Sequence, residues 1–424
     1  MATVYTAARV PGSIYMAVFR SRKMFLLLLL GFASGLPLAL TAGTLQAWLA
    51  AEHVDIVAIG WFALVGQPYT WKFVWSPLMD RYTPPFLGRR RGWLLITQLA
   101  LAGAITFMGT LSPKDAPWLL GAAALAVAFL SASQDIVFDA LRTDWLAREE
   151  RGAGAAVSVL GYRLAMLVSG AGALILADQW LGWTATYWLM AALMGVGMLA
   201  AWFALEPEGA QAAPRTLEEA VLKPFAEFMS RDGAVALLIL VILYKLGDAF
   251  AGNLTTAFLL RGPGFSLTEV GGINKGFGLA ATIVGALAGG ALMAKMRLYR
   301  ALLLFGILQA VTNLGFMALA AAGKSYALMV TVIGLENLCG GMGTAAYVAL
   351  LMALCDRRFS ATQYALLSAL SAVGRVYVGP VAGYLVGSLG WAQFFFFTFL
   401  IALPGLALLA WLRPRIDALD QSKV

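Results

Sequence analysis

Residues 24–50 read MFLLLLLGFASGLPLALTAGTLQAWLA, a stretch without a single charged side chain. About 20 such predominantly apolar residues are enough for a helix to cross a bilayer. The pattern recurs along the chain, which is 61% hydrophobic and 12% charged, with a mean hydropathy of +0.80. Soluble domains are about one quarter charged. The sequence therefore predicts an all-α protein that crosses a membrane several times.

Twelve windows have the length and hydropathy of membrane spans. They are residues 24–50, 56–79, 92–111, 116–141, 153–177, 184–205, 234–260, 269–293, 299–321, 326–351, 362–387 and 391–412. The hydrophilic segment 206–233, with a short amphipathic run over 217–228, divides them six against six. We expect two pseudo-symmetric six-helix bundles, 1–205 and 234–424, joined by a linker on the membrane surface. The first span runs past signal-peptide length, so we expect it to be retained.

The distribution of basic residues predicts the orientation in the membrane. If the N-terminus is cytoplasmic, 22 Lys and Arg flank the spans on that side and only Lys114, Arg261 and Lys324 lie on the other. Such an excess of basic residues marks the cytoplasmic side, so both termini are expected there. The net charge of +8 is spread over short loops instead of one face. Nucleic acid is therefore not an expected partner.

The two halves repeat a pattern in corresponding spans. Gly161-Tyr162-Arg163 in the fifth span is followed by Gly182-Trp183, and Gly374-Arg375 in the eleventh is followed by Gly390-Trp391. A duplicated half of this kind is typical of secondary transporters, whose pathway lies between the repeats.

Nine ionisable side chains fall inside the predicted spans. A charge in hydrocarbon costs several kcal/mol, so such residues usually face a watered cavity or pair with one another. We expect them to line a polar interior. They are Lys72, Asp135, Asp139, Arg163, Lys245, Asp248, Lys275, Glu336 and Arg375.

Several classes of function lack the residues that they need. No Walker A motif occurs, because Ala318 stands where the first glycine before Gly323-Lys324 should be. His53 is the only histidine, so neither a two-histidine metal site nor a histidine-based triad can form. We expect no enzyme activity, no cofactor and no metal. Of the classes of function considered, transport driven by an ion gradient is the one that remains.

Carboxyl groups within the spans are the candidates for proton coupling. Asp135 and Asp139 are four residues apart and share one helix face. Burial and like charge raise the proton affinity of at least one of them, as burial does for Glu336. A permanent ion pair of Arg163 with either aspartate is an equal alternative. Asp248 is the fourth candidate, although Lys245, three residues before it, is predicted to pair with it.

Intramembrane cations exceed the acids that obviously neutralise them, which suits an anionic substrate. Aromatic faces and amides nearby suit sugar rings and peptide backbones. The candidate substrate-binding residues are Lys72, Arg163, Lys245, Lys275, Arg375, Tyr69, Trp71, Gln134, Tyr162, Tyr244, Asn253, Asn274, Asn337 and Gln363.

The loop after the second span contains Pro77-Leu78-Met79-Asp80-Arg81 and then Gly88-Arg89-Arg90-Arg91. It resembles the Asp-Arg…Gly-Arg-Arg signature of the major facilitator superfamily, with a longer spacing. By that resemblance Asp80, Arg81, Arg89 and Arg90 would latch a cytoplasmic gate. Topology alone explains the arginines but leaves Asp80 unexplained.

Further stretches are similar to the AmpG type of anhydromuropeptide permease. They are Leu30 to Leu38, Leu87 to Trp93, Ser133 to Ala140, and Glu150 to Arg163. The resemblance implies a major facilitator fold in the inner membrane of a Gram-negative bacterium. It also implies proton-driven import of GlcNAc-anhydro-MurNAc peptides for wall recycling, linked to induction of β-lactamase.

We therefore expect a twelve-helix monomeric symporter in a lipid bilayer, with protons and a muropeptide as its partners. Two alternatives stay open. One is transport of another compound, by uptake of an acyl-CoA or efflux of a drug. The other is a membrane sensor of wall fragments that does not transport.

Overall fold

The computed structural model describes residues 21–146, 150–206, 223–355 and 360–421, and all regular elements within these ranges are helical. The all-α prediction is confirmed. The first half contains α2 (Arg22–Thr41), α3 (Gly43–Ala51), α4 (Ile56–Phe62), α5 (Gln67–Trp71), α6 (Ser76–Arg81), α7 (Arg89–Gly109), α8 (Pro117–Trp145), α9 (Arg151–Met166), α10 (Ala173–Leu176) and α11 (Gly182–Phe203).

The second half follows α12 (Lys223–Met229), which lies within the predicted linker. It contains α13 (Ala234–Leu243), α14 (Leu246–Arg261), α15 (Leu267–Glu269), α16 (Gly278–Met293), α17 (Leu298–Ala322), α18 (Tyr326–Leu354), α19 (Ser360–Tyr377), α20 (Gly379–Leu389), α21 (Trp391–Trp411) and α22 (Arg413–Gln421). Short 3₁₀ segments at Ala63–Gly66 and Lys72–Val74, and π-helical segments at Leu167–Gly172, Ala177–Leu181 and Val270–Phe277, complete the described helices.

Ten described helical stretches are long and apolar enough to cross a membrane. One of them, Gly154–Phe203, passes through the predicted spans 153–177 and 184–205, with Gly182 in a left-handed conformation between them (φ 69°). The predicted span 56–79 is divided into α4, α5, α6 and two 3₁₀ segments, so its pieces are individually short. With these two differences, the helices account for the twelve predicted spans.

Four predicted spans are interrupted instead of continuous, and the first of them breaks at Ala42, between α2 and α3. The second is broken around Pro68 and Pro77, which lie in the first turns of α5 and α6. The seventh breaks at Tyr244–Lys245, and the eleventh breaks at Val378, just before Pro380. Proline lacks an N–H for the helical ladder, which accounts for two of the breaks. Broken helices expose backbone and polar side chains at membrane depth, as transporter sites require.

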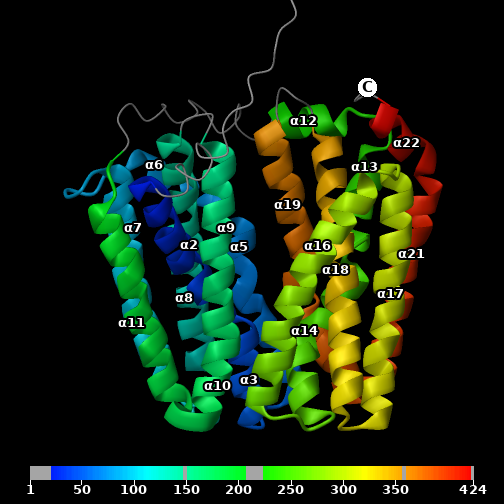
Figure 1. Ribbon diagram of the computed structural model, residues 1–424, viewed down its shortest axis with the longest axis horizontal. Coiled ribbons are helices and arrows are strands. Elements are labelled where there is room, and N and C mark those ends of the chain that lie inside the picture. Colours follow the sequence, from blue (N-terminus) through cyan, green and yellow to red (C-terminus); the bar gives the residue numbers. More distant parts are fainter. Residues whose placement is uncertain (1–20, 147–149, 207–222, 356–359, 422–424) are drawn as a thin grey trace, which may run out of the picture.

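Figure 1 shows the two halves side by side, with α6, α12 and α22 at one end and α3, α10 and α14 meeting at the other. The contacts between the halves run through α3, α4, α5 and α10 of the first half and α14, α15, α19 and α20 of the second. The tightest is between α4 and α20, where Gly60 packs against Gly379 and Gly383 without room for a Cβ. The halves are therefore joined at the end away from α22.

Candidate functional site

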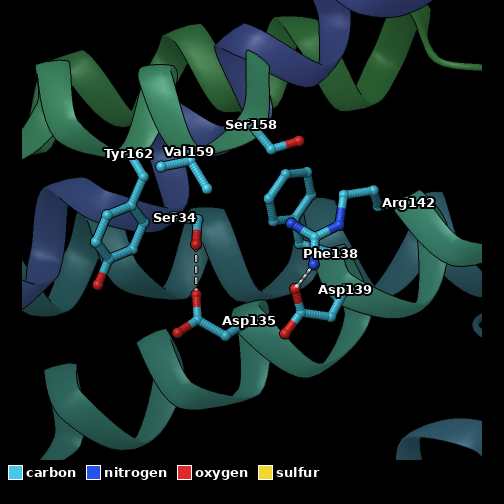
Figure 2. Close-up of a pocket in the computed structure, with 8 residues that line it drawn as sticks. All are labelled: Ser34, Asp135, Phe138, Asp139, Arg142, Ser158, Val159 and Tyr162. Atoms are coloured by element: carbon cyan, nitrogen blue, oxygen red, sulfur yellow. Dashed lines mark hydrogen bonds and ion pairs between the residues drawn. The ribbon is translucent and has the colours of Figure 1, made fainter. Parts of the chain in front are cut away.

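A pocket of about 130 Å³ opens in the first half between α2, α8 and α9. Asp135 and Asp139, one turn apart on α8, both face it, which confirms their shared helix face (Figure 2). Ser34 reaches the pocket from α2, and Val159 and Tyr162 reach it from α9. The pocket thus holds two carboxylates at the depth of the membrane-spanning helices.

The two carboxylates have different partners. The Ser34 hydroxyl donates a hydrogen bond of 2.5 Å to Asp135, which has no cation within ion-pair distance among the described residues. Asp139 pairs with Arg142 at 2.9 Å and with Lys72 at 4.0 Å, and its side chain is 51% exposed. Asp139 is therefore neutralised by two neighbouring cations. Asp135 is the member of the pair whose hydrogen bond among the described residues comes from a neutral donor and that forms no direct ion pair there.

The predicted ion pair of Arg163 with Asp135 or Asp139 is wrong. Arg142 lies one helical turn from Asp139 on α8 itself, and Lys72 approaches from the 3₁₀ segment that follows α5. These two cations occupy the place that the prediction gave to Arg163. Within the described chain Arg163 forms no ion pair, so its charge is available for another group.

The second half has its own polar cluster where the seventh span is broken. Lys245 Nζ lies 3.2 Å from Asp248 Oδ2, which confirms the predicted pairing. The same ammonium donates to Gln309 Oε1 at 3.2 Å and to Thr344 Oγ1 at 3.3 Å. Glu336 interacts electrostatically with Lys245, Asp248 and Lys275. This cluster joins α14, α17 and α18 around two acids and two cations.

Glu336 resembles Asp135 in its bonding. It accepts a hydrogen bond of 2.9 Å from the amide of Asn337 and forms no ion pair among the residues that the structure covers. Asn337 is held in turn by Thr282, whose hydroxyl donates to it at 2.9 Å. Each of the two polar clusters therefore contains one carboxylate without a direct cationic partner among the described residues.

Lys275 lies at the junction of the halves. Its ammonium donates to Thr256 at 2.8 Å and sits 2.9 Å from where a side chain on Gly43 would begin. Gly170 of the first half also faces its aliphatic stem. Lys275 of the second half therefore packs against Gly43 and Gly170 of the first half.

Residues from both halves come together in a group that we call the midline cluster: Trp71, Lys72, Tyr162, Arg163, Arg375 and Tyr377. The indole of Trp71 donates to the Tyr377 hydroxyl at 2.9 Å, across the halves. Tyr162 interacts electrostatically with both arginines. Asn253 donates to the backbone carbonyl of Arg375 at 3.2 Å, which supports the chain just before the break after α19.

Other predicted site residues lie away from the midline cluster. Gln363 is buried near α12 and donates to Glu227. Tyr244 is buried, stacks on Tyr347 at 5.6 Å and donates to the carbonyl of Leu302. In the first half Gln134 is buried and Tyr69 is partly buried, and Asn274 lies in the π-helical segment Val270–Phe277.

The predicted gate loop has partners that the sequence did not indicate. Arg90 pairs with Asp144 of α8 at 3.0 Å. Glu206, predicted to lie in the linker, accepts hydrogen bonds of 2.7 and 3.0 Å from the backbone N–H groups of Arg90 and Arg91, and so caps α7. Arg81 is exposed and lies over the ring of Tyr82, and Arg89 is partly buried. The side chain of Asp80 lies outside the described residues.

The end where the halves meet, the closed end, is held by contacts between helix termini. Asp178 of the first half accepts hydrogen bonds from the backbone N–H of Thr268 at 3.0 Å and from its hydroxyl at 2.5 Å, at the start of α15. In the opposite sense, Arg261 of the second half donates to the carbonyls of Leu49 and Ala50 at the end of α3, at 3.1 and 2.9 Å. Each charge complements the dipole of the helix that it caps.

Gln46 adds a third contact at the closed end. Its amide donates to the carbonyl of Asn253 at 2.5 Å and accepts from the N–H of Ala257 at 3.2 Å, both on α14. Sequence reasoning did not single out Gln46 or Asp178, and it used Arg261 only as a loop charge. Their roles depend on which helices face each other, which hydropathy does not report.

Comparison with known proteins gives a consistent relationship. A family model described as Major Facilitator Superfamily matches residues 27–376. The "Anhydromuropeptide permease" of Escherichia coli K12 is 58% identical over 406 residues, covering 96% of this chain and 83% of that protein.

Solved structures share the fold at low sequence identity. A bacterial homologue of the human lysosomal transporter Spinster, crystallised inward-facing and unoccupied, superposes with a TM-score of 0.71 at 14% identity, covering 95% of this chain and 98% of that one. The peptide transporter POT in complex with sulfate has a TM-score of 0.71 at 13% identity, with coverages of 94% and 96%. At such identities the likeness concerns the fold alone.

Proposed function

The chain belongs to the major facilitator superfamily, and from that premise we propose that it imports anhydromuropeptides in symport with protons. The observation that carries the substrate is the 58% identity, over nearly the whole chain, to a protein named anhydromuropeptide permease. The arrangement of charges between the halves supports the same substrate class. The protein would act in the inner membrane of a Gram-negative bacterium as a monomer, and its imported product would feed wall recycling and β-lactamase induction.

Arg163 and Arg375 are the proposed anchors for the carboxylates of the substrate. They lie on α9 and α19, one in each half, and neither forms an ion pair among the described residues. A guanidinium grips a carboxylate through two parallel hydrogen bonds, which gives both affinity and orientation. A peptide carboxylate bound between them would draw the halves together.

Asp135 is the proposed proton carrier of the first half, and Glu336 is its counterpart in the second. Both lack a direct cationic partner in the described chain. A carboxyl held by a neutral donor keeps its hydrogen bond in either protonation state, whereas Asp139 and Asp248 would leave a cation unpaired on protonation. Proton exchange is therefore least costly at Asp135 and Glu336.

The contacts at the closed end support an alternating-access cycle. The halves are tied there by Gln46, Asp178 and Arg261, while α6, α12 and α22 lie at the other end. If both termini are cytoplasmic, as the basic loops predict, the closed end is periplasmic and this state faces inward. Breaking three groups of hydrogen bonds would let the periplasmic end open, as rocking of one repeat against the other requires.

Uptake by the purified chain in sealed vesicles tests the proposal. Labelled GlcNAc-anhydro-MurNAc tripeptide should accumulate when the outside is acidic, and collapse of the proton gradient should abolish the accumulation. Competition with an excess of acyl-CoA or of free peptide should be weak. Accumulation that survives collapse of the gradient contradicts proton coupling, strong competition by acyl-CoA contradicts the substrate, and binding without accumulation would identify a sensor.

A further inference from the structure

Two aromatic side chains meet across the halves at places where their helices end. Trp71 is the last residue of α5, and the 3₁₀ segment Lys72–Val74 follows it. Tyr377 is the last residue of α19, and α20 begins two residues later. The indole N–H of Trp71 donates to the Tyr377 hydroxyl at 2.9 Å. This bond uses the polar edges of both side chains and leaves their ring faces unpaired with each other.

Both aromatic side chains are accessible instead of packed in a core. Trp71 is 47% exposed and Tyr377 is 37% exposed. By contrast, the stacked rings of Tyr244 and Tyr347 in the same half as Tyr377 are 8% and 5% exposed. Both side chains lie at the junction of the halves, because a hydrogen bond joins them across it. Phe73 packs beside Trp71, with ring centroids 5.9 Å apart, and enlarges the apolar surface.

A basic residue lies close in the chain to each member of the aromatic pair. Lys72 follows Trp71 directly, and its side chain is 36% exposed. Arg375 lies two residues before Tyr377 and is also exposed. A ligand that covered both rings would therefore meet one cation from each half at its edges.

We propose that the Trp71–Tyr377 pair is the subsite for the sugar of the substrate and that it sets the preference for a glycopeptide over a free peptide. The proposal rests on the proposed function and deepens it. A pyranose presents an apolar face of C–H groups, which complements the electron-rich face of an aromatic ring. Its hydroxyls at the edge can reach the Tyr377 oxygen, and an acidic substituent on the sugar can reach Lys72 or Arg375.

Because the pair crosses the halves, the sugar would contact both halves at once. A ligand that covers both rings binds best when the Trp71–Tyr377 contact is formed, so it favours the conformation in which this contact exists. A free peptide would reach the arginines but would not cover the aromatic pair. The preference for sugar is thus assigned to these two side chains and not to the charges.

The test compares two probes on the purified full-length chain: a GlcNAc-anhydro-MurNAc tripeptide and the same tripeptide without sugar. Calorimetry gives the ratio of their dissociation constants for the wild type and for Trp71→Leu, Trp71→Phe and Tyr377→Leu. Loss of a stacking surface weakens binding by roughly tenfold, as for bases stacked on aromatic side chains. We expect both leucine variants to lose about tenfold in the preference for the glycopeptide, with unchanged affinity for the tripeptide.

Matched variants separate stacking from misfolding. Trp71→Phe keeps a ring and should retain most of the preference. Trp118→Leu removes an 89% exposed tryptophan at the start of α8 and should retain all of it. Equal loss of both probes in Trp71→Leu, or full retention of the preference, overturns the subsite. A wild type that binds neither probe overturns the proposed substrate and the subsite together, whereas a wild type that binds both alike overturns the subsite alone.

Discussion

At the scale of single residues, the bonding of each carboxylate separates candidates that look alike in sequence. Asp135 and Asp139 are four residues apart, yet only Asp139 lies within ion-pair distance of described cations. Ser34 gives Asp135 a neutral donor at 2.5 Å. The distinction makes Asp135 the residue on which proton coupling is expected to depend.

Asp135→Asn should uncouple transport without unfolding the protein. Gradient-driven uptake should fall by about tenfold or more, the size of effect typical of losing a proton-transfer group. Exchange of labelled for unlabelled substrate, which does not need proton release, should continue. Asp115→Asn, which changes an exposed loop aspartate, is the matched control and should leave both rates unchanged. An Asp135→Asn variant with normal gradient-driven uptake would remove Asp135 from the mechanism.

The Lys245–Asp248 pair makes a prediction about stability. Lys245→Met would leave the partly buried Asp248 without its cation and would remove the donor to Gln309. Breaking such a pair from one side costs about 3 kcal/mol, whereas replacing both partners is often neutral. Thermal unfolding in detergent should therefore show a lower Tm for Lys245→Met and recovery in Lys245→Met/Asp248→Leu. A single variant as stable as the wild type would show that the pair contributes nothing to folding.

At the scale of elements, the sequence predicted the spans but not their interruptions. Apolar length and basic loops define a membrane helix, so all twelve spans could be recognised. Hydropathy does not report backbone breaks, although Pro68 and Pro380 mark two of them. Hydropathy also does not report how each helix is rotated about its own axis, and so which side chains face one another. For that reason the sequence predicted Asp135 or Asp139 as the partner of Arg163 and included Gln363 among the substrate-binding residues, although Gln363 contacts Glu227. It did not indicate that Tyr377 faces Trp71 of the other half.

Reciprocal capping at the closed end predicts how the two halves separate. Asp178→Asn keeps the shape of the side chain but removes the charge that complements the start of α15, and Arg261→Gln removes the charge that complements the end of α3. Both changes should favour opening of this end, because a charge at a helix terminus contributes about 0.3–1 kcal/mol or more. Spin labels across the closed end should report a larger share of long distances. Arg413→Gln, at the opposite end, is the control, and an unchanged distance distribution would contradict the latch.

Close packing of α4 on α20 gives a second prediction at this scale. A side chain on Gly60 would collide with the carbonyl of Gly379, so Gly60→Val should prevent the closed end from forming. Labelling of a cysteine placed in α3 should then become faster, and uptake should fall. Gly103→Val, on α7 with no neighbour within 4 Å of its Cβ position, should behave as the wild type. Slow labelling in Gly60→Val would show that closure does not need this contact.

At the scale of the whole molecule, the two halves divide the work of transport. Each contributes one arginine to the midline cluster and one carboxylate without a direct cation, Asp135 in the first half and Glu336 in the second. The halves are tied at one end by caps that involve only a few side chains. A substrate held by both halves can therefore bias the position of the whole assembly.

Proton entry driven by substrate is the most direct test of this account. Proteoliposomes with a trapped pH-sensitive dye and no initial gradient would receive anhydromuropeptide on the outside. We predict internal acidification that follows the time course of uptake in the wild type and is abolished in Asp135→Asn. Uptake of the muropeptide at the normal rate with no change of internal pH would contradict proton symport through the space between the halves.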